Sequence, residues 1–118
     1  MIKPFFIIIF ILELLMASPY EKGRSIYFQH GCANCHGTQA EGSGIYPKLA
    51  LKRKILIINR LDDFKNGKAT SQTAEMMFSF ANELSKKDIE NVSIFLSNFK
   101  KNTSTKYEVS DDILGSVD

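Results

Sequence analysis

The chain has 118 residues, of which 44% are hydrophobic and 24% charged, and its formal net charge is +2. This length corresponds to one small domain, and a charge so close to zero, with no basic block, argues against a nucleic-acid partner. Without its apolar beginning and its polar end the folded part is nearer to about 80 residues, and domains this small bury only about 60% of the surface of their unfolded chain, so they often depend on metals or cross-links. We therefore expect a fold that needs stabilisation beyond its own core.

Residues 1–17 have the layout of a secretory signal peptide. Lys3 precedes an apolar run over 5–12, which is too short to cross a bilayer as a helix. Cleavage is predicted after Ala17, because Pro19 disfavours a cut one residue later, and the mature protein is then expected in the periplasm. The alternative is an uncleaved interfacial anchor, the one case in which the chain would contact a membrane.

The stretch 18–30 is predicted to form a helix that ends at its last residue, where a glycine follows. Ser18 can cap this helix, Pro19 suits its first position, and Glu21 would complete a capping box. Glycine at position 23 lowers the stability of a helix by about 1 kcal/mol relative to alanine. It indicates either a close helix crossing or a tolerated surface glycine.

The segment Cys32-Ala33-Asn34-Cys35-His36 is the most informative pattern in the chain. Two thiols three positions apart, followed directly by an imidazole, are the attachment spacing of c-type haem: both cysteines form thioethers and the histidine binds iron. A thioredoxin-like dithiol would need a strand before the pair, and none is readable. A zinc site would need four ligands, and His30 is the only other histidine. A structural disulfide would leave His36 without a role.

Residues 37–46 are rich in glycine and are predicted to form a loop that leads to Pro47. A histidine that binds haem iron needs its other ring nitrogen held by a hydrogen-bond acceptor. The backbone carbonyl of Pro47 is a candidate acceptor for His36.

Residues 48–65 are predicted to form a second helix that stops at Asn66-Gly67. Its basic beginning, over 48–54, is either a solvated face or a docking patch. Its core stripe is expected to hold Leu51, Ile55, Ile58 and Leu61.

Two adjacent methionines, Met76 and Met77, provide the second informative feature. A haem held only by His36 has an open sixth position, and a thioether there raises the reduction potential and excludes other ligands. Met77 is the predicted ligand and Met76 a core residue, although spacing alone does not choose between them. If neither binds, the chain would be an open-site haem enzyme or gas sensor.

The last helix is predicted to begin at Ser85, a capping serine followed by acidic Asp88 near the positive helix end. Beyond it, residues 100–118 are polar and predicted to be disordered, unless they wrap a partner. The apolar stripe of the helix holds Ile89, Val92, Phe95, Leu96 and Phe99.

Taken together, residues 23–96 resemble the class I c-type cytochromes, both the short bacterial ones with one haem and the halves of the dihaem ones. The motifs that carry the resemblance are Gly23 with Tyr27, Cys32-Ala33-Asn34-Cys35-His36-Gly37, Tyr46-Pro47-Lys48-Leu49-Ala50, Phe64-Lys65-Asn66-Gly67, Met76-Met77, Leu84-Ser85 and Asp88-Ile89.

The resemblance implies an all-α domain over residues 18–99, with three to five helices wrapped around one covalently attached haem. It also implies that Met77 is the sixth iron ligand, that Pro47 supplies its carbonyl to His36, and that the first and last helices cross at Gly23 beside Phe95. The chain departs from the family at Phe95, where tyrosine is common, at Ser93, where alanine is common, and in its tail.

The function that follows from the resemblance is one-electron transport in periplasmic respiration or a related chain. Such a protein is a carrier and not an enzyme, and its partners are a redox donor and a redox acceptor that bind transiently. The alternative is the cytochrome subunit of a periplasmic dehydrogenase complex that oxidises sulfide or another sulfur compound.

Overall fold

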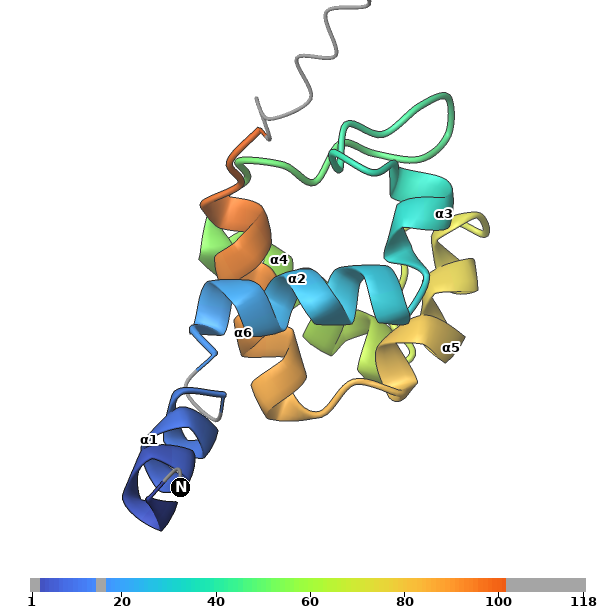
Figure 1. The fold of residues 1–118 in the computed structure, drawn as a ribbon. Helices are drawn as coiled ribbons and strands as arrows, with labels where there is room; N and C mark the ends of the chain where they lie inside the picture. Colours follow the sequence, from blue (N-terminus) through green and yellow to red (C-terminus); the bar gives the residue numbers. More distant parts are fainter. Residues whose placement is uncertain (1–2, 15–16, 102–118) are drawn as a thin grey trace, which may run out of the picture.

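The computed structural model describes residues 3–14 and 17–101, which fold into six α-helices and one 3₁₀ turn (Figure 1). No β-strand occurs among these residues, so the predicted all-α class is confirmed. Five of the α-helices lie within residues 18–99. The elements are α1 (Pro4–Leu14), α2 (Pro19–Gln29), α3 (Cys32–His36), α4 (Lys54–Lys65), the 3₁₀ turn η1 (Ala74–Met76), α5 (Met77–Asn82) and α6 (Lys86–Ser97).

Helix α2 crosses α6 at the glycine that the sequence singled out (Figure 1). A Cβ atom placed at Gly23 would overlap the backbone carbonyl of Asn91 and would lie 2.8 Å from the Cβ of Phe95. The ring of Tyr20 packs edge-on against Phe95, with 5.2 Å between ring centroids. The close crossing beside Phe95 is therefore confirmed, and glycine is required there because a side chain would force the two helices apart.

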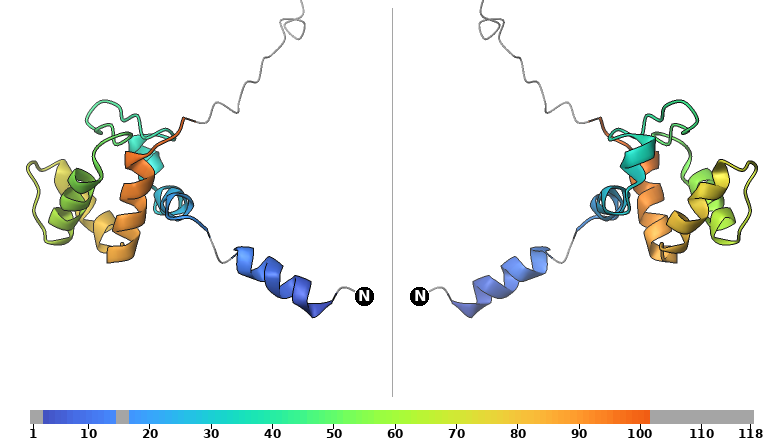
Figure 2. Two further views of the ribbon diagram at one scale, coloured as in Figure 1. Left: turned by 90° about the vertical axis from the view of Figure 1, so that its left-hand side faces the viewer. Right: turned by 90° about the vertical axis from the view of Figure 1, so that its right-hand side faces the viewer.

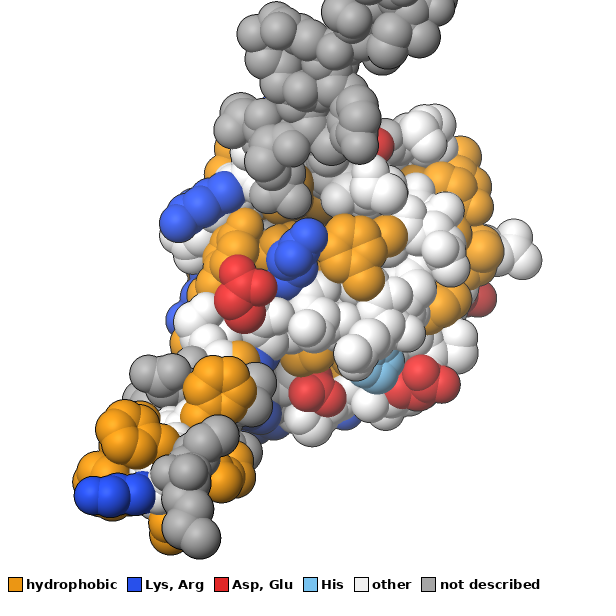
Figure 3. Space-filling model, in the orientation of Figure 1, with side chains coloured by type: hydrophobic (Ala, Val, Ile, Leu, Met, Phe, Trp, Pro, Cys, Tyr) orange, Lys and Arg blue, Asp and Glu red, His pale blue; other side chains and the backbone are white. Residues whose placement is uncertain are grey.

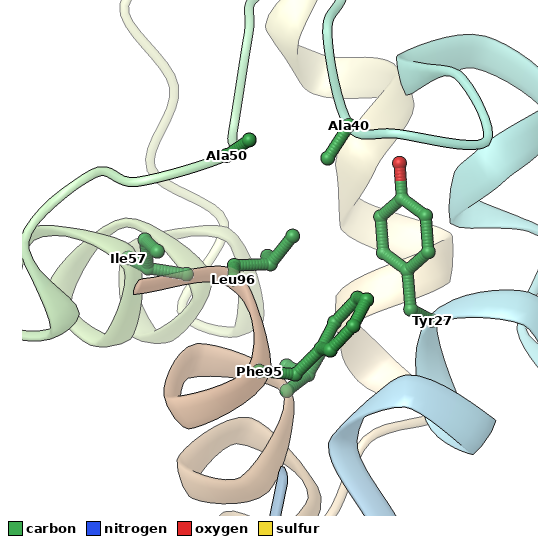
Figure 4. Close-up of a cluster of buried hydrophobic side chains, with 7 residues drawn as sticks. Tyr27, Ala40, Ala50, Ile57, Phe95 and Leu96 are labelled. Carbon is green, nitrogen blue, oxygen red and sulfur yellow. The ribbon is translucent and has the colours of Figure 1, made fainter. Parts of the chain in front are cut away.

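The hydrophobic core joins α2 and α6 to α4 and to two loop segments. Figure 4 shows the side chains of Tyr27 and Phe95 beside each other, with Ala40 and Ala50 brought in from the loops. The loops are tied together because the amides of Leu49 and Ala50 both donate to the carbonyl of Ala40, at 2.9 and 3.0 Å. The buried members of this core are Tyr27, Ala40, Ala50, Ile57, Val92, Phe95 and Leu96.

The starts of α2 and α6 were predictable from their caps. Ser85 and Asp88 form a complete capping box, with each side chain 3.0 Å from the other's backbone nitrogen. At the start of α2, Ser18 accepts a hydrogen bond from the amide of Glu21 at 3.2 Å. The second bond of the box, from the amide of Ser18 to the carboxylate of Glu21, is not present among the described contacts, so only half of the predicted box forms.

The predicted helix over 48–65 begins six residues late, at Lys54. The preceding segment is held as a loop because its amides bond to distant carbonyls: Leu51 donates to Leu96 at 2.8 Å and has a left-handed φ of +63°. The expected stripe is wrong at Leu51 and Ile55, which are exposed. Its other two members, Ile58 and Leu61, are partly buried. The buried residues of α4 are Ile57 and Phe64, and the predicted stop at Asn66-Gly67 is confirmed.

Helix α1 stands apart from the other helices in every view of Figures 1 and 2. Its apolar side chains from Phe5 to Leu12 are all exposed and are seen as the hydrophobic group over α1 in Figure 3. In the part of the chain that the structure describes, no helix is both long enough and apolar enough to cross a membrane. Of the tail predicted to be disordered, residues 100–118, all but Lys100 and Lys101 lie outside the described residues.

Candidate haem site

Helix α3 presents both cysteines and His36 on a single short turn. Glycines with positive φ lie on both sides of it, Gly31 at +75° and Gly37 at +92°, and these angles let the chain enter and leave sharply. Cys32 and Cys35 are partly buried free thiols, and His36 is 7% exposed. Burial raises the pKa of the Cys32 thiol, so this group stays protonated in the structure as described.

The imidazole of His36 is oriented by the backbone of the following loop. Its Nδ1 lies 2.8 Å from the carbonyl oxygen of Pro47. Because a carbonyl only accepts, Nδ1 carries the proton and Nε2 keeps the lone pair that a metal requires. The amide of Gly42 also donates to the carbonyl of His36 at 2.8 Å. The ring and its backbone are thus both fixed by the loop over 37–47.

Tyr27 provides a second support that the sequence did not reveal. Its side chain is fully buried, and its hydroxyl donates to the carbonyl of Gly37 at 2.6 Å, directly after His36 in the chain. Burial, with smaller contributions from Cys32 and Glu41, raises the pKa of Tyr27 well above its usual value. The hydroxyl therefore remains a donor at all ordinary pH values. The sequence indicates that an aromatic residue matters at this position, but it does not indicate which group accepts the hydrogen bond of its hydroxyl.

A cavity of about 700 Å³ lies against α3 and is enclosed mainly by apolar side chains of α4, α5 and α6. Cys32, Cys35 and His36 form one part of its wall, and Pro47 and Met77 also border it. This volume is within the range of sites for large organic ligands. All five residues predicted for the site are therefore brought to one cavity.

The two methionines differ in their surroundings although both border the cavity. Met77 begins α5 and is partly buried, whereas Met76 ends the 3₁₀ turn and is 54% exposed. The expectation that Met76 belongs to the core is therefore wrong.

His30 also borders the cavity, from the end of α2. Its Nδ1 lies 3.7 Å from a carboxylate oxygen of Glu83, and this pair links α2 to the segment between α5 and α6. Sequence reasoning gave His30 no role. A pairing between residues 53 positions apart (83 minus 30) leaves no local signal in the sequence.

The rival chemistries lack the residues that they need. No group of three His, Cys, Asp or Glu side chains suited to a metal ion occurs within residues 3–14 and 17–101. A helix, not a strand, precedes the two thiols, so the thioredoxin-like arrangement is absent from this part of the chain. The cavity, the thiols and the oriented imidazole instead fit a covalently attached haem.

The family model described as cytochrome c matches residues 20–100. The chain belongs to the cytochrome c family. Proteins of this family are electron carriers with a covalently attached haem, and Cys32, Cys35 and His36 match its attachment motif. The resemblance to class I c-type cytochromes and the haem cofactor that it implied are thus confirmed.

Three similar proteins illustrate the range of this cytochrome family. The chain is 34% identical to cytochrome c-554(547) of Halothiobacillus neapolitanus over 66% of this chain and 93% of that protein. It is 30% identical to the cytochrome subunit of sulfide dehydrogenase of Chlorobaculum tepidum, over 70% of this chain and 73% of that protein. A solved structure of cytochrome c4 from Acidithiobacillus ferrooxidans superposes with a TM-score of 0.58 at 25% identity, covering 68% of this chain and 49% of the other.

Proposed function

We propose that this cytochrome carries single electrons between redox proteins, with His36 and Met77 as the axial ligands of the haem iron. The observation that carries the proposal is the contact between His36 Nδ1 and the Pro47 carbonyl at 2.8 Å, beside a cavity that Met77 also borders. It leaves Nε2 of His36 as the metal-binding nitrogen, and Met77 supplies the soft sulfur donor. When bound, the haem iron alternates between the ferric and ferrous states and so stores one electron.

Each residue of the site has one task in this proposal. Cys32 and Cys35 hold the macrocycle through thioether bonds, and Pro47 fixes the imidazole and increases its basicity. Met77 favours the ferrous state and occupies the position where an exogenous ligand would enter. The apolar wall excludes water, and a low dielectric also favours the less charged reduced site.

The test is the pair of variants Met77→Ala and Met76→Ala in the holoprotein. Met77→Ala should lose the weak sulfur-to-iron band of the oxidised spectrum, show a lower reduction potential and bind carbon monoxide readily. Met76→Ala should keep the band, and because Met76 is 54% exposed its truncation should cost less than the 2 to 5 kcal/mol typical of buried positions.

Two results would contradict the proposed ligands in different ways. Wild-type protein that binds carbon monoxide at neutral pH would identify an open-site haem enzyme or sensor. Loss of the band in Met76→Ala and not in Met77→Ala would leave the carrier function intact and move the ligand by one residue.

The proposal includes export, with residues 1–17 as a signal peptide that is removed before the carrier works in the periplasm. The basic Lys3 and the apolar run after it support this assignment. Mass spectrometry of the holoprotein from a periplasmic fraction should find Ser18 as the first residue. A mature chain that retains α1 would instead support an interfacial anchor.

A second candidate function is that of a subunit in a dehydrogenase complex. Its support is the 30% identity to the cytochrome subunit of sulfide dehydrogenase from Chlorobaculum tepidum. Size-exclusion chromatography of the native extract separates the two functions: a free carrier elutes near its monomer mass, whereas a subunit co-elutes with a larger partner.

A further inference from the structure

The two proposed iron ligands come from separate parts of the chain. His36 ends α3 and lies within residues 17–47, whereas Met77 begins α5 and lies within residues 66–84. Both side chains border the haem cavity. One iron can bind both of them only if the two parts keep a fixed separation, so the contacts between these parts matter for the site.

The ion pair of His30 and Glu83 joins the two parts directly. Its Nδ1 and carboxylate oxygen are 3.7 Å apart, and the two side chains are 27% and 71% exposed. Among the hydrogen bonds, ion pairs and aromatic contacts of the described residues, it is the one that connects residues 17–47 to residues 66–84. A single polar contact therefore bridges the segment of each ligand.

Helix α5 depends on contacts with other elements because it is short. Its six residues are fewer than an isolated helix needs in water, and no side chain caps its beginning. The ring centroids of Phe64 on α4 and Phe78 on α5 are 6.3 Å apart. The ammonium group of Lys65 on α4 donates to the carbonyl of Leu84, just after α5. These contacts fix α5 relative to α4, but not relative to the helix that carries His36.

The two members of the ion pair lie at positions that can transmit a displacement to the ligands. Glu83 directly follows α5, whose first residue is Met77. His30 caps the end of α2 and precedes Gly31, which leads into α3. The pair therefore connects the end of the helix that carries one ligand to the turn before the helix that carries the other.

We propose that His30 is a positioning residue, whose ion pair with Glu83 holds α5 at the separation from α3 that lets Met77 bind the iron. This inference rests on the proposed axial ligands and names a residue that keeps them in place. Loss of the pair would let the end of α5 move away from α2, and the sulfur would then leave the iron more often. A competing ligand would consequently bind more tightly.

The probe is pyridine, which is titrated into the oxidised holoprotein at about pH 6, just below the pH at which histidine side chains ordinarily lose their proton. Loss of the sulfur-to-iron band gives its dissociation constant. His30→Gln and Glu83→Gln should each lower this constant about threefold, the effect expected for an exposed pair. The double variant should lower it no further, because both substitutions break the same contact. His30→Lys keeps a cation and should retain the wild-type value.

The ion pair of Lys87 and Glu90 provides the matched control. It has the same separation of 3.7 Å but lies within α6. Lys87→Gln and Glu90→Gln should leave the dissociation constant of pyridine unchanged. An equal decrease in these controls would show that any broken surface pair has the effect, and it would overturn the inference.

Two further comparisons separate the contact from a long-range effect of charge. His30→Gln removes a positive charge and Glu83→Gln a negative one, so an effect of charge on the ferric iron would shift the dissociation constant of pyridine in opposite directions. Such opposite shifts would overturn the positioning role, whereas shifts in the same direction support it. Added salt should bring the wild-type constant toward that of His30→Gln, because salt screens an exposed pair.

The spectrum of the wild type distinguishes failure of this inference from failure of the proposed function. An oxidised wild type without the sulfur-to-iron band would contradict Met77 as a ligand, and with it the proposed function. A band that is present, with equal dissociation constants for wild type and His30→Gln, would overturn the positioning role alone. Thermal unfolding adds a structural measurement: a lower midpoint for His30→Gln with an unchanged constant would show that the pair serves only the stability of the fold.

Discussion

The two sides of this domain are stabilised in different ways. Where α2 meets α6, Gly23 brings the backbones together, and Tyr27 and Phe95 are 0% and 2% exposed. On the other side, α4 and α5 turn apolar side chains such as Phe64 and Phe80 toward the haem cavity. The helix crossing at Gly23 is packed by protein alone, whereas the second side would pack against the cofactor. A domain of about 80 residues can therefore divide its core between its own side chains and a covalently held haem.

Removing the haem anchors should have the largest effect. In a Cys32→Ser/Cys35→Ser variant no covalent haem should form, so acid-acetone extraction should remove all colour from the polypeptide, while wild type keeps it. Amide hydrogen exchange should then show greater loss of protection in α4 and α5 than in α2 and α6. His30→Ala is the control and should keep its colour. Colour that stays with the double variant would disprove attachment at this pair.

On the side where α2 meets α6, the helix crossing should be the position most sensitive to substitution. Gly23→Ala should lower the free energy of unfolding by about 3 kcal/mol or more, because its Cβ overlaps the carbonyl of Asn91. Gly67→Ala is the matched control: it has a φ of +71° and open space around it, so it should cost only about 1 to 2 kcal/mol. Guanidinium unfolding of both holoproteins measures the difference, and equal losses would contradict the close crossing.

The hydrogen bond from Tyr27 to Gly37 joins α2 to the end of α3, and its loss should have an intermediate effect. Tyr27→Phe should lower the free energy of unfolding by about 1 kcal/mol near neutral pH. Because burial raises the pKa of folded Tyr27, the stabilisation by this neutral hydroxyl is complete below the unfolded pKa of about 10 and is lost as the pH rises above it.

The measurement is thermal unfolding of both proteins between pH 7 and pH 11. The gap between wild type and Tyr27→Phe should narrow above pH 10, since only wild type has this proton to lose. A gap that stays constant or widens with pH would show that the hydroxyl does not act through this proton. The reduction potential of Tyr27→Phe shows separately whether the support reaches the iron ligand.

The last effect has the opposite sign and is expected at Ser93, on α6. Its side chain is fully buried, and its hydroxyl has no hydrogen-bond partner among the described atoms. Ser93→Ala should therefore raise the free energy of unfolding by about 1 kcal/mol, because a buried polar group without a partner is removed. A destabilised variant in chemical denaturation would indicate that this hydroxyl does have a partner.

Most of the fold was predictable where the signal is local. Ser85 with Asp88, the stripe along α6 and the glycine that ends α2 act within a few residues, so sequence rules identify them. The start of α4 was missed because the conformation of Leu51 is set by the carbonyl of Leu96, 45 positions away (96 minus 51). Ile55 was misassigned to the core for the same reason. The predicted stripe was counted from a helix start six residues too early, at Lys48, whereas α4 begins at Lys54.

The residues that would bind the haem were predicted more completely than the residues that hold them in place. Cys32, Cys35 and His36 are adjacent in sequence, and the thioether chemistry fixes their spacing. The hydroxyl of Tyr27 and the carboxylate of Glu83 reach their partners only after the chain has folded. No property of either residue in the sequence reveals those contacts. Met76 and Met77 both border the cavity and differ in exposure, which their spacing in the sequence does not reveal.

The contact between α2 and α6 also determines when this chain can finish folding. Gly23 and Asn91 are separated by 68 positions (91 minus 23), so the two ends of the domain meet last in the order of synthesis. Until residues around Phe95 have emerged from the ribosome, α2 has no surface against which to pack, and closing so long a loop is entropically costly. The nascent chain therefore stays open until translation of the domain is nearly complete. That delay would suit the export that we propose for this chain, because an exported polypeptide must stay unfolded until it has crossed the membrane.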